Sequence, residues 1–385
     1  MVSARRSGGR GMLSGANQEG CCVMEPSMMQ ALVLHAVGDL RCESVPRPVA
    51  RHGEALVRVA AVGVCGSDLP RIYTHGAYRF PLIPGHEVAG VIEHLQGSAE
   101  SEVPTKLCVG DRVAIYPLIP CRMCAFCQLG AYAQCVAYDY LGSRSDGGFA
   151  EFVRAPQANL LPLPEGVSLL DAALTEPAAV ALHAMRQGQV QPGDTVAILG
   201  AGPIGMVLAQ WARILGAGRV LLVDIDPQKL GMARELGLGE TFNAREGDPV
   251  AWTQEVTLKR GVDVVVEAAG ASATFEQALR MARPLGQVVI MGNPAGSVVL
   301  PQATVSQVLR KELTIRGTWN SVYAELPVNE WRVVLQMLAA RRLNLHALIT
   351  HRVPLSRGVG ALEMMRDQRE AYGRVVLVNE IGKEL

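Results

Sequence analysis

The stretch that decides the fold is TVAILGAGPIGMVLAQWA, residues 195–212. An apolar run typical of a strand leads into Gly200, Gly202 and Gly205 at G-x-G-x-x-G spacing, and a helical pattern follows. That spacing alone is common, but between a strand and a helix it predicts a dinucleotide-binding turn. Gly200 would permit the tight turn, Gly202 a close approach to a pyrophosphate, and Gly205 the packing of helix on strand.

The residues after the first glycines point to the cofactor. Pro203 and Ile204 open the expected helix, whose first N–H groups would face the phosphates. The next strand pattern ends at Asp224, which can accept hydrogen bonds from the ribose hydroxyls of NAD and would repel a 2′-phosphate. We therefore expect NAD rather than NADP. The alternatives are a glycine-rich turn without a ligand and, for Asp224, an ordinary helix N-cap.

Strand and helix patterns alternate around this motif, and we expect residues 186–319 to form a doubly wound parallel sheet that binds the dinucleotide. Residues 28–185 show short β-rich runs broken by Gly, Pro and Asp, so this part should be mainly β. Residues 320–385 should add one helix and two strands that return to it. The predicted fold class is therefore α/β with two domains.

Length and charge limit the other possibilities. A chain of 385 residues exceeds the usual size of a single core, so two domains are the default. The 36 basic and 36 acidic residues leave no net charge that would favour nucleic acid or an anionic membrane. No apolar run approaches the roughly 18 residues of a membrane span. Residues 1–27 resemble a disordered tail without a secretory signal, and we expect a cytoplasmic protein.

A cluster of cysteines predicts a metal site. The segment CRMCAFCQLGAYAQC places Cys121, Cys124, Cys127 and Cys135 within fifteen residues, in a lobe expected at about 117–140. Four thiolates at this spacing can surround one tetrahedral zinc ion and leave no open position, which makes the site structural. An iron–sulfur cluster is the competing occupant, because thiolates bind both.

Other possible ligands lie far apart in the chain: Cys65 in GVCGSDL, His86 and Glu87 in PGHE, and Glu176 in TEPAAV. Three protein ligands and one open position are typical of a catalytic zinc site. Each residue is weak evidence alone, since a lone buried Cys or His usually belongs to a core. Their assignment depends on the family pattern.

From residue 28 to the C-terminus the chain resembles the zinc-dependent medium-chain dehydrogenases. The likeness is carried by GVCGSDL, PGHEVAGVI, GDRVAIYP, the four-cysteine lobe, GGFAEFV, TEPAAVALHA and GAGPIG. Within that family the chain is most similar to dehydrogenases of galactitol 1-phosphate, through residues 65–87, 117–130, 138–151 and 309–319. Dehydrogenases of sorbitol and threonine are the next neighbours. The resemblance implies a GroES-like catalytic domain beside a Rossmann cofactor domain.

The resemblance also assigns roles. It makes Cys65, His86 and Glu176 the ligands of a catalytic zinc, with Glu87 as a ligand that exchanges with water or substrate. Asp68 would orient the ligand histidine, and Ser67 would begin a proton relay from the substrate hydroxyl. Together with the structural ion, two zinc ions per chain are expected.

Three positions depart from the family pattern. Pro70 replaces the histidine that continues the relay, so the proton must leave by water or Glu87. Gln96 replaces a glycine, and residues 98–108 resemble a lengthened loop. The N-terminal tail has no counterpart in the family.

The expected reaction is oxidation of a secondary alcohol of a polyol phosphate, galactitol 1-phosphate giving tagatose 6-phosphate, with NAD as hydride acceptor. Arg is the best side chain for a phosphate, and the candidates are Arg71, Arg79 and Arg144. Arg144 is favoured among them, and Tyr78 would form a wall for the polyol. The alternatives are an NAD-dependent sorbitol, threonine or butanediol dehydrogenase and, remotely, a non-catalytic NAD-binding protein. The expected partners are a small molecule and further copies of the chain in a dimer or tetramer, joined through LTIRGTW.

Overall fold

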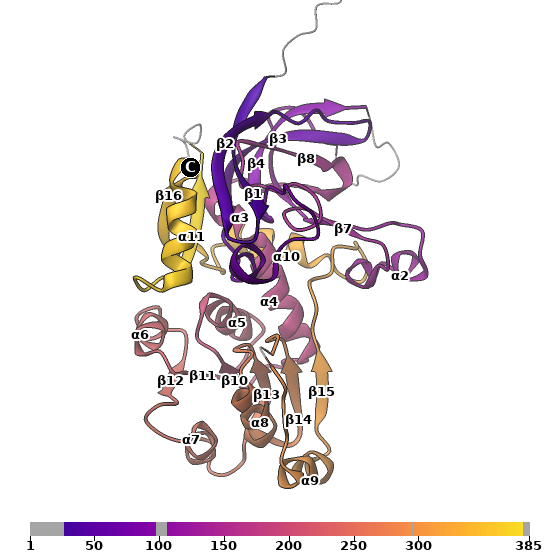
Figure 1. The fold of residues 1–385 in the computed structure, drawn as a ribbon. Helices are drawn as coiled ribbons and strands as arrows, with labels where there is room; N and C mark the ends of the chain where they lie inside the picture. The colour runs from indigo at the N-terminus through magenta and orange to yellow at the C-terminus, as the bar shows by residue number, and fades with distance from the viewer. Residues whose placement is uncertain (1–26, 98–105, 295, 380–385) are drawn as a thin grey trace, which may run out of the picture.

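The computed structural model describes residues 27–97, 106–294 and 296–379. Two large sheets dominate it, one at each end of the molecule in Figure 1. This arrangement confirms the expected α/β fold class, with a mainly-β part and a doubly wound parallel part. The expected tail and most of the lengthened loop lie outside the described residues. No helix in the described segments is long and apolar enough to cross a membrane.

The parallel sheet has six strands, and every neighbouring pair is parallel. Across the sheet they are β12 (Glu240–Asn243), β11 (Arg219–Asp224), β10 (Thr195–Leu199), β13 (Val262–Glu267), β14 (Ala282–Ile290) and β15 (Thr314–Gly317). Counted from β10, the spatial order is 3-2-1-4-5-6, and the reversal beside β10 is where such sheets bind dinucleotides. All residues of β10 and β13 are buried, as strands covered on both faces require.

Helices cover this sheet. They are α5 (Pro203–Ile214), α6 (Pro227–Glu235), α7 (Pro249–Val256), α8 (Ser272–Met281) and α9 (Gln302–Lys311). The turn between β10 and α5 carries the glycine motif, so the N-terminus of α5 opens at the carboxyl end of the central strand.

The second sheet has seven strands. Its path is β16 (Ile349–Pro354), β17 (Arg374–Val378), β3 (Glu54–Gly63), β4 (Glu87–Gln96), β5 (Arg112–Ile115) and β9 (Leu160–Pro162), and β8 (Phe152–Pro156) also pairs with β3. A separate hairpin joins β1 (Met28–Ala36) and β2 (Asp39–Pro46). β17 pairs with β3 across more than 300 residues of sequence, so the C-terminal strand lies in the same sheet as strands from the first part of the chain.

One of the three hydrophobic clusters in the described residues spans both parts. Helix α4 (Thr175–Gln187) runs between them and packs on α5 and on α10 (Glu330–Ala339). The indole N–H of the buried Trp211 in α5 donates to the Ala178 carbonyl of α4 at 2.9 Å. This packing sets the first turn of α4, with Glu176, between the two sheets.

The remaining α-helices and strands lie outside these groups. They are α1 (Asp68–Pro70), α2 (Ala125–Gln128), α3 (Leu169–Ala173), α11 (Gly358–Asp367), and the two-stranded ladder of β6 (Leu118–Ile119) with β7 (Asp139–Tyr140). The four-cysteine lobe lies between β6 and β7 and projects to one side in Figure 1.

Candidate functional site

The structure brings the four lobe cysteines together. The sulfur atoms of Cys121, Cys124, Cys127 and Cys135 all lie within 4.8 Å of one another. The Sγ atoms of Cys121 and Cys127 are 3.9 Å apart. A tetrahedral zinc ion with bonds of about 2.3 Å would separate its sulfur ligands by about 3.8 Å. The lobe therefore fits a four-coordinate thiophilic ion.

The backbone of the lobe favours thiolates. The Cys121 N–H donates to the Cys135 sulfur at 3.2 Å, and the Cys124 N–H to the Cys121 sulfur at 3.4 Å. Backbone N–H groups of Val136 and Cys127 lower the pKa of the Cys124 thiol to about 6. Burial instead raises the pKa of Cys127 to about 12, and a bound cation would displace its proton.

A second group of ligand atoms forms where β3 and β4 meet. Cys65 follows β3, His86 precedes β4, and Glu87 is the first residue of β4. One ligand atom from each lies within 4.8 Å of the others. The antiparallel register pairs Gly63 with Glu87, so the hydrogen bonding of these two strands places Cys65 beside the His-Glu pair. Mixed sulfur, nitrogen and oxygen ligands suit zinc.

Asp68 lies directly behind this group. Its fully buried carboxylate is 3.5 Å from His86 Nδ1 and accepts the Cys65 N–H at 3.0 Å. Its other close partner is the Arg71 guanidinium at 2.6 Å. Burial disfavours the charged His86 ring, but the Asp68 carboxylate outweighs it and raises the pKa of His86 well above its usual value. Asp68 thus has the position of a group that orients a ligand histidine.

Among the described residues, one carboxylate oxygen of Glu87 has a partner and the other has none. Its Oε2 pairs with the buried guanidinium of Arg374, at the start of β17, while its buried Oε1 has no hydrogen-bond partner. A buried carboxylate oxygen without a hydrogen-bond partner, beside a cysteine and a histidine, is suited to a cation. The donor set and this orphaned oxygen both fit a zinc ion.

Arg374 was not predicted from the sequence. It is 5% exposed; burial opposes its charge, but the Glu87 carboxylate holds the pKa of Arg374 above its usual value. The sequence did carry a signal for it: Arg374 begins the apolar run RVVLV. An arginine in a buried strand needs a charged partner, so this pattern indicates a buried ion pair.

Glu176 lies near the ligand group but outside the set whose atoms fall within 4.8 Å of one another. It lines the same cavity as Cys65 and His86, and its Oε1 accepts a hydrogen bond from the Tyr140 hydroxyl at 3.3 Å. Burial, together with the Glu87 carboxylate, raises the pKa of Glu176 to about 7.

The cavity at this group has a volume of about 310 Å³. Ser67, Arg71, Tyr78 and Arg144 line it, and so does Trp319. The Ser67 hydroxyl is 3.3 Å from the Cys65 sulfur. Tyr78 is 72% exposed, so it forms the rim rather than the floor.

The arginine candidates differ in their partners. Arg71 is engaged by Asp68. Arg144 lies over the rings of Tyr78 and Tyr138, at 4.3 and 4.4 Å from their centres, and has no carboxylate partner in the described segments. Arg79 does not line this cavity: it pairs with Asp146 and faces a different pocket, so the prediction of Arg79 as a phosphate ligand was wrong.

The glycine turn has the geometry that the motif predicts. Gly200 has φ of +105°, a conformation that favours glycine, and a Cβ on Gly205 would lie 1.9 Å from the Gly200 carbonyl oxygen. Pro203 is the first residue of α5, with Ile204 next, and no side chain caps the helix. Its first N–H groups therefore remain available to an anion.

Asp224 lies at the end of β11, beside this turn. Its carboxylate accepts the N–H groups of Ala201 at 2.7 Å, Ile225 at 2.7 Å and Asp226 at 2.9 Å. Asp226, not Asp224, caps α6 through the Gln228 N–H. The N-cap alternative for Asp224 is therefore wrong, and Asp224 holds the turn itself.

Two family models match the chain. The model described as alcohol dehydrogenase GroES-like domain matches residues 51–165, and the model described as zinc-binding dehydrogenase matches residues 203–340. Together they span more than half of the sequence and include the second ligand group and the four-cysteine lobe.

Curated relatives and solved structures agree with these models. The chain is 37% identical to galactitol 1-phosphate 5-dehydrogenase of Escherichia coli, covering 84% of this chain and 92% of the relative. It is 33% identical to sorbitol dehydrogenase of Bacillus subtilis, covering 88% and 94%. The structure of the Escherichia coli galactitol-1-phosphate dehydrogenase matches with TM-score 0.85, 36% identity, and coverage of 91% and 100%.

One further solved structure bears on the cofactor. A putative zinc-binding dehydrogenase from Sinorhizobium meliloti bound to NADP matches with TM-score 0.83 and 30% identity, covering 91% of this chain and 99% of that one. Relatives of this fold therefore include one that holds the phosphorylated dinucleotide.

Proposed function

The chain belongs to the zinc-dependent medium-chain dehydrogenases, and from this premise we propose that it oxidises a secondary alcohol of a polyol phosphate to a ketose phosphate with NAD. It is an alcohol dehydrogenase, so the alternative of a non-catalytic NAD-binding protein is set aside. The proposed substrate is galactitol 1-phosphate and the product tagatose 6-phosphate. The relative with that activity supports this choice.

One observation carries the phosphate assignment. Arg144 is the cavity-lining arginine that no described carboxylate engages, and two tyrosine rings support its guanidinium. A planar guanidinium can bind a phosphate through two parallel hydrogen bonds. A polyol without phosphate would leave these donors unpaired.

We assign the catalytic ion to Cys65, His86 and Glu176, with Glu87 as the exchangeable ligand, and a structural ion to the four lobe cysteines. When bound, the catalytic zinc supplies a Lewis acid that lowers the pKa of the substrate hydroxyl. Asp68 keeps the His86 ring oriented by facing its Nδ1. Arg374 balances the charge of Glu87.

We assign proton transfer to Ser67. It lines the cavity and is exposed to solvent, so its hydroxyl can take a proton from the substrate and pass it to water. Pro70 has no side-chain group that could continue this path. For each turnover the alcohol loses one proton to solvent and one hydride to the dinucleotide.

We propose that Gly200, Gly202, Pro203, Ile204 and Gly205 bind the pyrophosphate of NAD, and that Asp224 binds its adenosine ribose. A cavity of about 480 Å³ lies next to this turn, between α6 and residues 368–373. It is lined from both parts of the chain, as expected for a dinucleotide held between them.

The choice of NAD predicts the effect of Asp224→Ala. The substitution removes the ribose acceptor and the charge that repels a 2′-phosphate, so KM for NAD should rise about tenfold and the preference for NAD over NADP should fall. Asp224→Asn is the matched control, since it keeps the volume and much of the hydrogen bonding to the turn. Steady-state kinetics with both dinucleotides measure this, and a wild-type preference for NADP would contradict the assignment.

A sorbitol, threonine or butanediol dehydrogenase is the second candidate, supported by the 33% identity to a sorbitol dehydrogenase. Initial NADH formation with galactitol 1-phosphate, galactitol, sorbitol and threonine at equal concentration separates the two. We expect the phosphorylated polyol to have the highest kcat/KM, by about tenfold or more. Faster turnover of an unphosphorylated substrate would refute the phosphate assignment and leave the zinc dehydrogenase intact.

We also propose a homo-oligomer in the cytoplasm. β15 is one of the two edge strands of the parallel sheet. Ile315 on this strand is 46% exposed, and Leu309 in the preceding helix α9 is 72% exposed. An exposed apolar edge is suited to pairing with the same edge of a second copy. The free thiols of the lobe suit a reducing compartment.

A further inference from the structure

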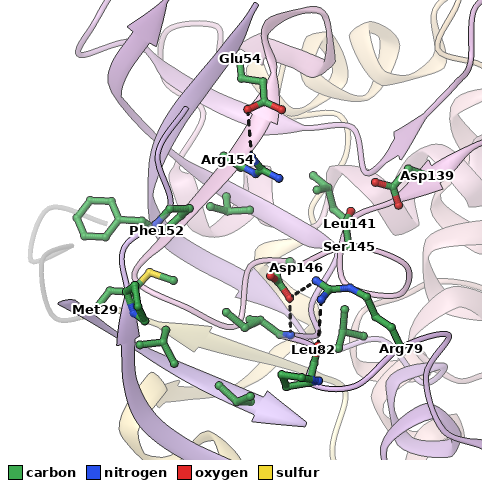
Figure 2. Close-up of a pocket in the computed structure, with 18 of the residues that line it drawn as sticks. Met29, Glu54, Arg79, Leu82, Asp139, Leu141, Ser145, Asp146, Phe152 and Arg154 are labelled. Atoms are coloured by element: carbon green, nitrogen blue, oxygen red, sulfur yellow. Dashed lines mark hydrogen bonds and ion pairs between the residues drawn. The ribbon is translucent and has the colours of Figure 1, made fainter. Parts of the chain in front are cut away.

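The loop after β7, residues 141–149, separates two cavities. One is the cavity of Cys65 and His86; the other, on the far side, has a volume of about 330 Å³ and is shown in Figure 2. The residues of β7 and of this loop divide between the two cavities. Tyr140, Ser143 and Arg144 line the first cavity, whereas Asp139, Leu141, Ser145 and Asp146 line the second.

The loop is tightly closed by its own backbone. The Tyr140 carbonyl oxygen accepts the N–H groups of Ser143, Arg144 and Ser145 at 3.2, 2.9 and 3.2 Å. Beyond Asp146, the Gly147 N–H donates to the Ile83 carbonyl at 2.7 Å. A change in the position of this loop therefore moves the base of the Arg144 side chain with it.

Arg79 ties this loop to the segment before β4, from the side of the second cavity. Its guanidinium donates to the carbonyl oxygens of Arg144 and Pro81, both at 3.1 Å, and pairs with Asp146 at 2.7 Å. Asp146 in turn accepts the Ile83 N–H at 3.0 Å. Figure 2 shows Arg79 and Asp146 pointing toward one another across this junction.

The same arginine also fixes the other support of Arg144. Tyr78 directly precedes Arg79, and its ring lies 4.3 Å from the Arg144 guanidinium carbon. Anchoring Arg79 therefore anchors both the backbone of Arg144 and one of the two rings that orient its guanidinium. An exposed Arg–Asp ion pair alone contributes little to stability. Here the Arg79 guanidinium also donates hydrogen bonds to two backbone carbonyls, and these directional bonds fix its position.

We propose that Arg79 and Asp146 form a latch that holds Arg144 in position to receive the phosphate of the substrate. In this account Arg79 is a positioning residue: it faces away from the substrate cavity and acts through the carbonyl of Arg144 and the ring of Tyr78. The proposal rests on the proposed function, because it deepens the assignment of Arg144 as phosphate receptor.

The test compares KM and kcat of Arg79→Gln with those of the wild-type holoenzyme, with galactitol 1-phosphate and with galactitol. We expect KM for the phosphorylated polyol to rise about fivefold, kcat to stay within about twofold, and both parameters for galactitol to change little. Arg79→Lys keeps a charge near Asp146 but not the planar guanidinium, so its KM for galactitol 1-phosphate should lie between that of the wild type and that of Arg79→Gln. An equal loss on both substrates would overturn the latch.

Two controls show whether the effect is specific. Arg41→Gln removes a second exposed arginine that pairs with an aspartate at 2.7 Å, on β2, and should leave KM unchanged. Adding Arg79→Gln to Arg144→Gln should raise KM little beyond the single Arg144 variant, because both changes remove one interaction with the phosphate. The latch would be overturned if Arg41→Gln raised KM as much as Arg79→Gln does. It would also be overturned if the effects of Arg79→Gln and Arg144→Gln on KM were additive.

The two proposals can fail separately. If the wild type prefers the phosphorylated polyol and only the Arg144 variant loses that preference, the function stands and the latch is wrong. If the wild type prefers an unphosphorylated polyol, the phosphate assignment is wrong. What then remains of the latch is that Arg79 and Asp146 hold Arg144 against that polyol: non-additive effects of Arg79→Gln and Arg144→Gln on its KM support this, and additive effects overturn it.

Discussion

Glu176→Ala is expected to lower kcat on the order of a thousandfold while the fold remains intact. The carboxylate supplies one of the assigned ligands of the catalytic ion, and a metal Lewis acid contributes several kcal/mol to the transition state. Bound zinc should fall from about two ions per chain to about one, since the cysteine lobe is untouched. Kinetics and metal analysis on the same preparation measure both effects.

The geometry also allows Glu87, rather than Glu176, to be the third ligand of the catalytic ion. Cys65, His86 and Glu87 already lie together, while Glu176 bonds to Tyr140. Near-normal turnover of Glu176→Ala would limit Glu176 to a supporting role and make Glu87 the third ligand. Glu87→Gln alone is a poor test, because it leaves the buried Arg374 without its partner and should destabilise the fold by about 3–5 kcal/mol. Glu87→Gln combined with Arg374→Met removes both charges and is the better variant.

Cys124→Ser is expected to remove about one zinc ion per chain and to lower the melting temperature by several degrees. In our assignment the four thiolates hold the lobe between β6 and β7 through one ion, so loss of that ion should remove a main constraint on the segment. The expected destabilisation is about 3 kcal/mol.

Cys108→Ser is the matched control for the lobe. Cys108 is exposed and lies outside both ligand groups, so its loss should change neither zinc content nor melting temperature. Unchanged zinc in Cys124→Ser would contradict the assignment of the lobe as a metal site. Iron and acid-labile sulfide in the wild-type protein would instead favour the iron–sulfur alternative.

Local patterns in the sequence were enough to predict the parallel sheet and the clustering of the four lobe cysteines. The glycine motif sits between a buried strand and a helix, and four cysteines within fifteen residues can reach one ion without help from the rest of the chain. The structure places both as those patterns predict. Each is determined by residues that are close in sequence.

Contacts between distant residues could not be predicted in the same way. Arg374 meets Glu87 across 287 positions, because β17 returns to pair with β3. Tyr140 reaches Glu176 only after the loop and α4 have packed. Arg79 was a phosphate candidate by residue type, but in the folded chain it pairs with Asp146 and lines the second cavity. Side-chain direction at such sites follows from tertiary packing, which residue type does not encode.

The most direct measurement of the central claim is the initial rate of NADH formation from galactitol 1-phosphate. It compares three preparations: the zinc-replete wild type, the same protein after a chelator has removed its accessible zinc, and the stripped protein after zinc is restored. We expect turnover with zinc, little turnover after stripping, and recovery on restoration, with Glu176→Ala inactive throughout. Undiminished NADH formation by a preparation that metal analysis shows to lack the catalytic ion would contradict the account.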